Sequence, residues 1–321
     1  MKKLLFIFLS IFLSVTSVLS LIIIKPASFT RAQTDDYKSY LQLWHIDGFA
    51  GGVGSRASLL KKLAEEYAKK SNVVITVTLH TAYSAEQNFK KGIFPDIFSY
   101  SNGVNLPYSR LNALPFKEQI GSYGERCYAV VWCMGGYVYV ARKGQKISGV
   151  IISDQQNTLP MLAYELSNVK IPIKTVEKST NALSCFYADE KLALIGTQRD
   201  LHRLSGKGYD LEVVPLCGFN DLYQYLSVLA DGNNYYSALS FIKWILQKEQ
   251  SENELEKIGM LAYGKQSEKN SSSLLKIIYN TQYDYVLQPF LSYEKLQNIK
   301  SLSNNYSENA QSIKSVLKQL K

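Results

Sequence analysis

Two side chains suited to ligand binding stand at the end of the apolar run at 41–44. Trp44 closes this run, and Asp47 follows it just before a glycine-rich turn and an amphipathic segment. Because ligands of open α/β sheets lie beyond the carboxyl ends of the strands, we expect both side chains to face a ligand. An indole offers a flat apolar face, and a carboxylate offers paired acceptors for hydroxyl groups. The competing interpretations are that Trp44 anchors the core and that Asp47 caps the turn.

Other apolar runs are followed by side chains of the same kinds. The further candidates for ligand contact are Tyr83, Tyr100, Ser101, Asn102, Trp132, Gln198, Arg199 and Asp200. Most of them follow a predicted strand, whereas Trp132 precedes a Gly-Gly pair. The competing interpretation of Trp132 is a side chain that packs in the core of its strand. The guanidinium of Arg199 can donate to two hydroxyls or to one carboxylate, or it pairs with Asp200 or Glu190 within its own lobe.

The sequence offers little that would catalyse a reaction. It has three histidines, none of them in a recognisable nucleophile motif, and no Gly-x-Ser-x-Gly. Asp47 and Asp96 remain as a possible glycosidase pair, since glycoside hydrolysis uses two carboxylates. The glycine-rich turn at 51–54 lacks the lysine of a phosphate-binding loop, and no Cys/His spacing indicates a metal. We therefore expect neither an enzyme nor a bound cofactor.

Composition indicates a globular chain of two lobes. The 321 residues are 46% hydrophobic and 20% charged, which is enough to bury two cores. The net charge of +9 is scattered, with no block of five like charges, so we expect no nucleic-acid partner. Cys127 and Cys133 flank one predicted strand and would lie too far apart for a disulfide, which favours free thiols.

The N-terminus indicates export. Lys2 and Lys3 precede the uncharged run Leu4–Ile24, whose length matches a bilayer span. The run is either a cleaved signal or an uncleaved membrane anchor, and its length favours the anchor. Residues 25–37 form a polar linker. Everything after Lys25 is expected on the extracellular side of the cell membrane, either anchored or secreted.

Hydrophobic periodicity predicts alternating strands and helices, which is typical of a doubly wound sheet. Leu60, Leu63 and Tyr67 share one face of a helix, and Ser55 or Ser58 caps it. A long strand at 128–144 is broken by Gly135-Gly136, where the chain is expected to cross between lobes. The other strands are predicted at 41–44, 73–79 (in a buried parallel position), 95–101, 147–153, 192–195 and 211–216, and the helices at 55–70, 84–91, 159–166, 237–250, 252–259 and near 313–320.

Four segments resemble, in order, the extracellular solute-binding proteins of carbohydrate-type ABC importers (family 1-like). They are 41-LQLWHIDGF-49, 95-PDIFSYS-101, 128-YAVVWCMGGYVYVARKG-144 and 186-FYADEKLALIGTQRD-200, followed by 237-SALSFIKWILQKEQ-250 and 258-IGMLAYGK-265. Together they span about residues 38–265. Glu190 replaces the glycine usual before Lys191, and the second lobe is short for this family between Lys143 and Cys185.

The resemblance implies a periplasmic-binding-protein-like (type II) α/β fold, with two α/β lobes around a ligand cleft and a hinge motion on binding. Lobe 1 would comprise 38–132 and 219–265, and lobe 2 would comprise 133–218 and 266–321. The implied function is capture of a sugar-like small solute and its delivery to the permease subunits of an ABC transporter. A ligand-sensing receptor that signals through a membrane partner is one alternative, and a cell-envelope glycosidase is another.

Overall fold

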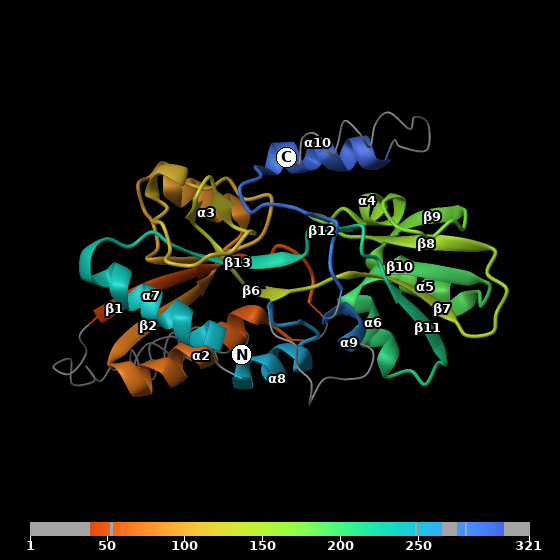
Figure 1. Cartoon of the computed structure of the whole chain (residues 1–321), viewed down its shortest axis with the longest axis horizontal. Coiled ribbons are helices and arrows are strands. Elements are labelled where there is room, and N and C mark those ends of the chain that lie inside the picture. Colours follow the sequence, from red (N-terminus) through yellow and green to blue (C-terminus); the bar gives the residue numbers. More distant parts are fainter. Residues whose placement is uncertain (1–38, 52–53, 248, 265–274, 280, 305–321) are drawn as a thin grey trace, which may run out of the picture. The chain divides into compact units, whose positions relative to one another are not determined.

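The computed structural model describes residues 39–51, 54–247, 249–264, 275–279 and 281–304 (Figure 1). The described residues belong to one compact unit. The predicted signal or anchor, the linker and the helix near 313–320 all lie outside the described residues. Within the described ranges, every helix is too short or too polar to cross a bilayer.

The first five-stranded sheet has the order β2-β1-β3-β13-β6. The strands β1 (Ser39–His45), β2 (Val73–Leu79) and β3 (Ile97–Tyr100) are parallel, while β13 (Tyr223–Val228) and β6 (Val130–Met134) add antiparallel pairs. The strand at 73–79 is parallel as expected, but it lies at the sheet edge and not in a buried position. One of its faces is open to solvent, and Leu79 is 61% exposed.

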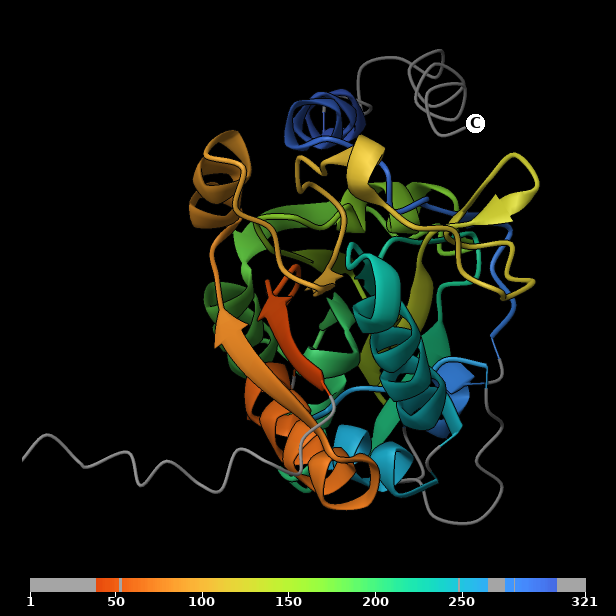
Figure 2. The ribbon, with the colours of Figure 1, turned by 90° about the vertical axis from the view of Figure 1, so that its left-hand side faces the viewer.

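Helices cover both faces of this sheet. The helices α2 (Arg56–Ser71) and α7 (Gly232–Gln247) lie side by side, with Tyr67 packed on Phe241 at 5.2 Å between ring centroids (Figure 2). The Ser55 hydroxyl accepts from the Ser58 N–H and caps α2, which confirms the first of the two expected caps. Helix α3 (Ala82–Lys90) packs Phe89 against Phe98 of β3. Helix α8 (Glu249–Lys257) follows α7. We call this sheet and these helices lobe 1.

The second five-stranded sheet, order β11-β7-β10-β8-β9, forms lobe 2. Its strands are β7 (Tyr137–Arg142), β8 (Gly149–Asp154), β9 (Ile173–Lys178), β10 (Leu192–Thr197) and β11 (Leu211–Pro215). Its helices are α4 (Pro160–Glu165), α5 (Ser179–Ala188), α6 (Gln198–Ser205) and α9 (Lys276–Tyr279). Smaller elements are η1 (Tyr108–Arg110), the hairpin of β4 (Ser122–Tyr123) and β5 (Arg126–Cys127), and the pair of β12 (Phe219–Asn220) and β14 (Tyr285–Val286).

The chain passes between the sheets where the sequence predicted a break. β6 ends in the first sheet, Gly135-Gly136 follow, and β7 begins in the second. Beside this crossing, the buried carboxyl of Asp221 accepts from the Tyr137 hydroxyl at 2.6 Å and from the Leu159 N–H at 3.1 Å. The lobe boundaries given above stay a prediction. All four cysteines are free, with Cys127 and Cys133 buried as expected.

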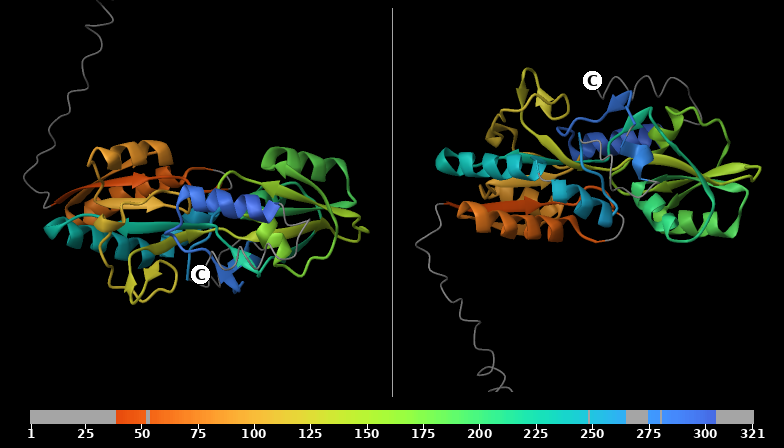
Figure 3. Two further views of the ribbon diagram at one scale, coloured as in Figure 1. Left: turned by 90° about the horizontal axis from the view of Figure 1, so that it is seen from above. Right: turned by 60° about the horizontal axis from the view of Figure 1, so that its bottom comes forward.

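Helix α10 (Tyr293–Asn304) joins elements of both lobes. Seen from above in Figure 3, it lies over the region between the two sheets. In lobe 1, a Cβ atom at Gly103 would come within 2.8 Å of Leu296. In lobe 2, the ammonium of Lys300 contacts the carboxylate of Asp154 at 2.7 Å. The C-terminal part of the described chain therefore holds a segment of each lobe.

Candidate ligand-binding cleft

The loop after β1 carries Asp47 to the edge of lobe 1. Pairing continues one residue beyond the strand, since the Ile46 N–H donates to the Ser99 carbonyl at 2.8 Å. The chain then passes Gly48, where a Cβ atom would lie 1.8 Å from the Cβ of Ser101. No side chain fits in that distance, so only glycine allows this close approach. The Asp47 side chain keeps 47% of its surface exposed.

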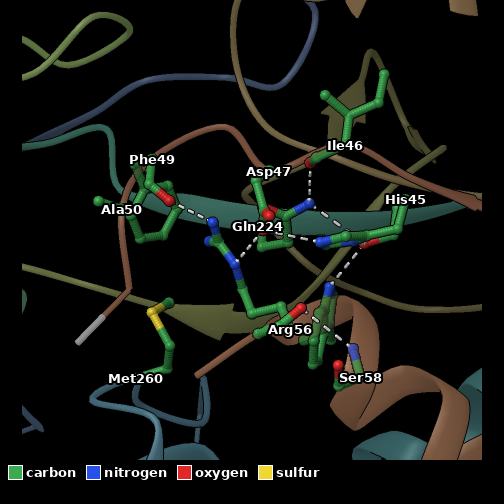
Figure 4. A network of polar contacts seen from close by, with 12 residues as sticks. His45, Ile46, Asp47, Phe49, Ala50, Arg56, Ser58, Gln224 and Met260 are labelled. Atoms are coloured by element: carbon green, nitrogen blue, oxygen red, sulfur yellow. Dashed lines mark hydrogen bonds and ion pairs between the residues drawn. The ribbon is translucent and has the colours of Figure 1, made fainter. Parts of the chain in front are cut away.

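Two basic side chains hold Asp47 in place (Figure 4). Its Oδ1 atom contacts His45 Nε2 at 2.9 Å and accepts from Arg56 Nε at 2.8 Å. Burial alone would raise the pKa of Asp47, but the hydrogen bond to His45 and the charge of Arg56 outweigh it and lower the pKa to about 2. Arg56 also donates to the Phe49 carbonyl and lies over the Phe49 ring. Asp47 is therefore an ionised acceptor with a fixed position.

Behind Asp47, a buried hydrogen-bond chain orients His45. Burial lowers the pKa of His45, so the neutral imidazole carries one proton. The Ser99 hydroxyl lies 2.9 Å from Nδ1 of His45, 3.2 Å from Nε1 of Trp132 and 3.2 Å from Nε2 of Gln224. Because Trp132 and Gln224 can only donate there, Ser99 gives its own proton to Nδ1, and Nε2–H of His45 points to Asp47.

Two of the cavities that Asp47 lines also share Gly48, Gln156 and Asn157, and together they form one cleft. The first has a volume of about 690 Å³ and lies between the β1 loop and residues of β8, β9, α5 and α6. The second has a volume of about 850 Å³ and extends over the start of α3 and the loop after β3 to Tyr293 of α10. Both cavities are lined by Asp47, Gly48, Gln156 and Asn157.

The segment 154–157, which comprises the last residue of β8 and the loop after it, forms the lobe 2 wall. The side chain of Gln155 accepts from the Ala50 N–H at 3.0 Å across the cleft and donates to Thr197 Oγ1 at 3.2 Å. Lys300 of α10 donates to the Gln155 carbonyl at 2.6 Å and pairs with Asp154. The two walls are thus already in contact on one side.

Four of the residues predicted from the sequence line this cleft. They are Asp47, Tyr83, Asn102 and Arg199. The Tyr83 side chain is 73% exposed, so its ring is available to a ligand. Asn102 is buried and donates to the Asp221 carbonyl at 3.2 Å. These residues come from both lobes, and their contact with a ligand stays a prediction.

The aromatic candidates on the first sheet lie outside both cavities. Trp44 is 5% exposed and its ring stacks on His80 at 4.3 Å and Phe89 at 5.8 Å between centroids. Tyr100 and Trp132 are buried, and the Tyr100 hydroxyl lies 3.0 Å from Ser227 Oγ. In this conformation their side chains pack the core, and their contact with ligand stays a prediction.

The remaining candidates support the walls. Ser101 packs beneath Gly48, and Gln198 donates to the Ala50 carbonyl at 3.2 Å while it accepts from the Gly136 N–H. The Asp200 carboxylate accepts from Ser153, from Ser179 and from its own helix cap at Thr197. All three candidates are buried. Burial raises the pKa of Asp200.

Several lining residues did not stand out in the sequence. They are Gln155, Gln156, Asn157, Lys178, Thr180 and Tyr293. The loop at 155–157 follows the strand predicted at 147–153, so the strand-end rule would have found it. Tyr293 gives no such signal, because it begins a helix and reaches the cleft only through the packing of α10. No cluster of His, Cys, Asp and Glu that suits a metal occurs in the part of the chain that the structure describes.

Comparison with known proteins identifies the fold. No protein-family model and no curated protein sequence matches this chain. A structure from work on xylan utilization by the thermophilic bacterium Caldanaerobius polysaccharolyticus aligns with a TM-score of 0.59 at 12% identity, over 88% of this chain and 99% of that chain. The GacH receptor of Streptomyces glaucescens, solved unliganded and with acarbose or an acarbose homolog, aligns with a TM-score of 0.55 at 13% identity, over 88% of this chain and 98% of that chain.

These alignments cover nearly all of each neighbour. The chain therefore has a periplasmic-binding-protein-like α/β fold, with two α/β lobes around a cleft, as the sequence predicted. At such low identities the likeness extends to the fold alone.

Proposed function

We propose that this protein captures a carbohydrate-like small solute in the cleft between its lobes. The observation that carries the proposal is the lining of the two joined cavities. Carboxylates and amides from both lobes converge there, including Asp47, Asn102, Gln156 and Asn157. Such planar groups suit pairs of sugar hydroxyls, and the exposed face of Tyr83 suits the C–H face of a sugar ring. Of the two structural neighbours, one comes from work on xylan utilization and the other was solved with acarbose or an acarbose homolog.

Binding without catalysis fits this geometry better than glycoside hydrolysis. Asp96 accepts from the Gln42 N–H and precedes β3, so it lies at the opposite end of the sheet from Asp47. Asp47 lies five positions after Gln42 along β1 and its extended continuation, which is roughly 16 Å. Glycosidase carboxylates lie about 5–9.5 Å apart, and one of them has a raised pKa. Asp47 has a lowered pKa instead.

Calorimetric titration of the full chain against a panel of mono- and oligosaccharides tests the proposal. The chain is held in a detergent without a sugar head group, since a maltoside would compete for the cleft. We expect saturable binding of at least one saccharide and no release of product. Absence of binding across saccharides, polyols and peptides would refute the proposal.

A matched pair of tyrosine variants locates the site. Tyr83 and Tyr123 are 73% and 77% exposed, but of the two only Tyr83 lines the cleft. Tyr83→Ala removes a stacking face and should weaken binding roughly 5- to 150-fold. Tyr123→Ala should leave affinity within about twofold. Equal effects of the two substitutions would place the solute outside this cleft.

Delivery to an ABC permease and attachment to the cell membrane form a further part of the proposal. Their support is the N-terminal run Leu4–Ile24 together with the binding-protein fold. We place the protein on the extracellular side of the membrane. Co-purification with permease subunits would support transport, whereas co-purification with a sensor kinase would support the alternative of a signalling receptor.

A further inference from the structure

The charged residues of the first cavity are not balanced. Two carboxylates and two cations line it, namely Asp47, Asp154, Lys178 and Arg199. Both carboxylates already have partners, because Asp47 pairs with Arg56 and Asp154 pairs with Lys300 at 2.7 Å. In the described parts of the chain, no carboxylate lies within ion-pair distance of Lys178 or Arg199. The lobe 2 side of this cavity therefore carries an excess of positive charge, because the charge of Asp200 acts on Arg199 less strongly than that of Arg203.

Arg199 is held so that its charge faces the cavity. Its guanidinium donates to the Ser179 hydroxyl, which in turn contacts Asp200 Oδ1 at 3.2 Å. Asp200 lies beneath the cavity and accepts from Ser153 and from the Thr197 N–H as well. That carboxylate is thus occupied by neutral donors, so Arg199 remains able to bind an anion.

Neighbouring groups strengthen this positive potential. Arg203 lies close enough to Arg199 to lower the pKa of its guanidinium, after the larger effect of burial. Ser179 and Thr180 line the cavity at the first turn of α5, and no side chain caps that helix. The helix N-terminus adds partial positive charge in the same direction. Lys178, which precedes α5, is exposed and free to reach a ligand.

We propose that this corner of the cleft, formed by Lys178 and Arg199, binds the carboxylate of an acidic saccharide such as a uronic acid. The inference rests on the proposed capture of a saccharide and adds a class of substrate to it. In such a complex, the sugar hydroxyls would face Asp47 and the side-chain amides of Gln156 and Asn157, which line both cavities. The guanidinium of Arg199 would donate two parallel hydrogen bonds to the sugar carboxylate.

Matched acidic and neutral saccharides test the inference by calorimetry with the full chain in the same detergent. The probes are glucuronate against glucose, galacturonate against galactose, and digalacturonate against its dimethyl ester. The buffer holds low salt and no phosphate, sulfate or acetate, because these anions would occupy the site. We expect the acidic member of at least one pair to bind roughly 10- to 100-fold more tightly, and this preference to shrink as salt is raised.

Two charge-neutralising substitutions assign the preference to the proposed residues. Arg199→Gln and Lys178→Gln should each weaken binding of the acidic saccharide more than binding of its neutral partner, so that most of the preference for the acid is lost. Arg126→Gln and Lys174→Gln are matched controls, since both residues are exposed and line neither cavity. The controls change the net charge equally and should retain the preference.

The outcomes separate the inference from the function on which it rests. Neutral saccharides that bind as tightly as acidic ones would overturn the inference and leave saccharide capture standing. An equal loss of affinity for the acidic and the neutral saccharide in Arg199→Gln and Lys178→Gln would also overturn the inference. No binding of any saccharide would overturn both proposals.

Discussion

Trp44 and Tyr83 should respond to substitution in opposite ways. Trp44 is 5% exposed and lies in a stack with His80 and Phe89, whereas Tyr83 is 73% exposed on the second cavity. Trp44→Ala leaves a hole in the core, and such large-to-small changes cost about 3–5 kcal/mol. For a unit of this size, we expect the thermal midpoint to fall by roughly 6–20 °C. Tyr83→Ala should change stability by less than about 0.5 kcal/mol.

Measurement of both properties on each variant decides the question. Differential scanning calorimetry gives the thermal midpoint, and titration well below that midpoint gives the affinity of the folded protein for the solute found in the panel. Tyr83→Ala should lose more affinity than Trp44→Ala, although His80 connects Trp44 to the cavity wall. The reasoning fails if Trp44→Ala keeps its midpoint and loses binding, since the indole would then face the ligand and not the core.

Three further predictions follow from other parts of the chain. Gly48→Ala forces a Cβ atom against Ser101, so we expect a loss of about 1–3 kcal/mol in stability and weaker solute binding. Urea unfolding measures the stability and calorimetry measures the binding. Wild-type values for both would contradict the close approach. Burial raises the pKa of Asp221 to about 7. The contribution of its protonated carboxyl to folding stability is therefore complete below about pH 4 and is lost as the pH rises through 7. Urea midpoints of Asp221→Asn should depend less on pH than those of the wild type. If Leu4–Ile24 stays attached, the protein should remain in membranes after carbonate extraction, whereas a soluble mature form that begins between Leu21 and Thr34 would indicate a cleaved signal.

Part of the order of the elements was predictable because periodicity and glycine breaks are local properties, whereas β9, β13, α6 and α10 were not predicted. The strand predicted at 192–195 and found at Leu192–Thr197, the crossing at Gly135-Gly136 and the cap at Ser55 all follow from neighbouring residues. The position of the strand at 73–79 at the sheet edge was not predictable in this way, because the strands that pair with it depend on the packing of the whole sheet. Apolar, β-branched residues favour edge and interior strands alike.

The cleft was predictable only where the strand-end rule applies. Asp47 and Arg199 follow strands, and both line a cavity. The same rule selects Trp44, yet α3 packs over its face of β1 and covers the indole. Tyr293 lies far along the chain from β1 and reaches the cleft through α10. Which side chains at a strand end remain open therefore depends on tertiary packing that local sequence patterns do not encode.

The contact between Lys300 and the segment 154–157 has a consequence for how the molecule assembles. Lys300 donates to the Gln155 carbonyl across a separation of 145 residues. A chain made from its N-terminus completes both large sheets before this lysine is added. The cleft of a nascent chain is therefore completed only after its two large sheets, and a polypeptide that stops short of α10 would have its sheets in place but one wall of the cleft without the contact from Lys300.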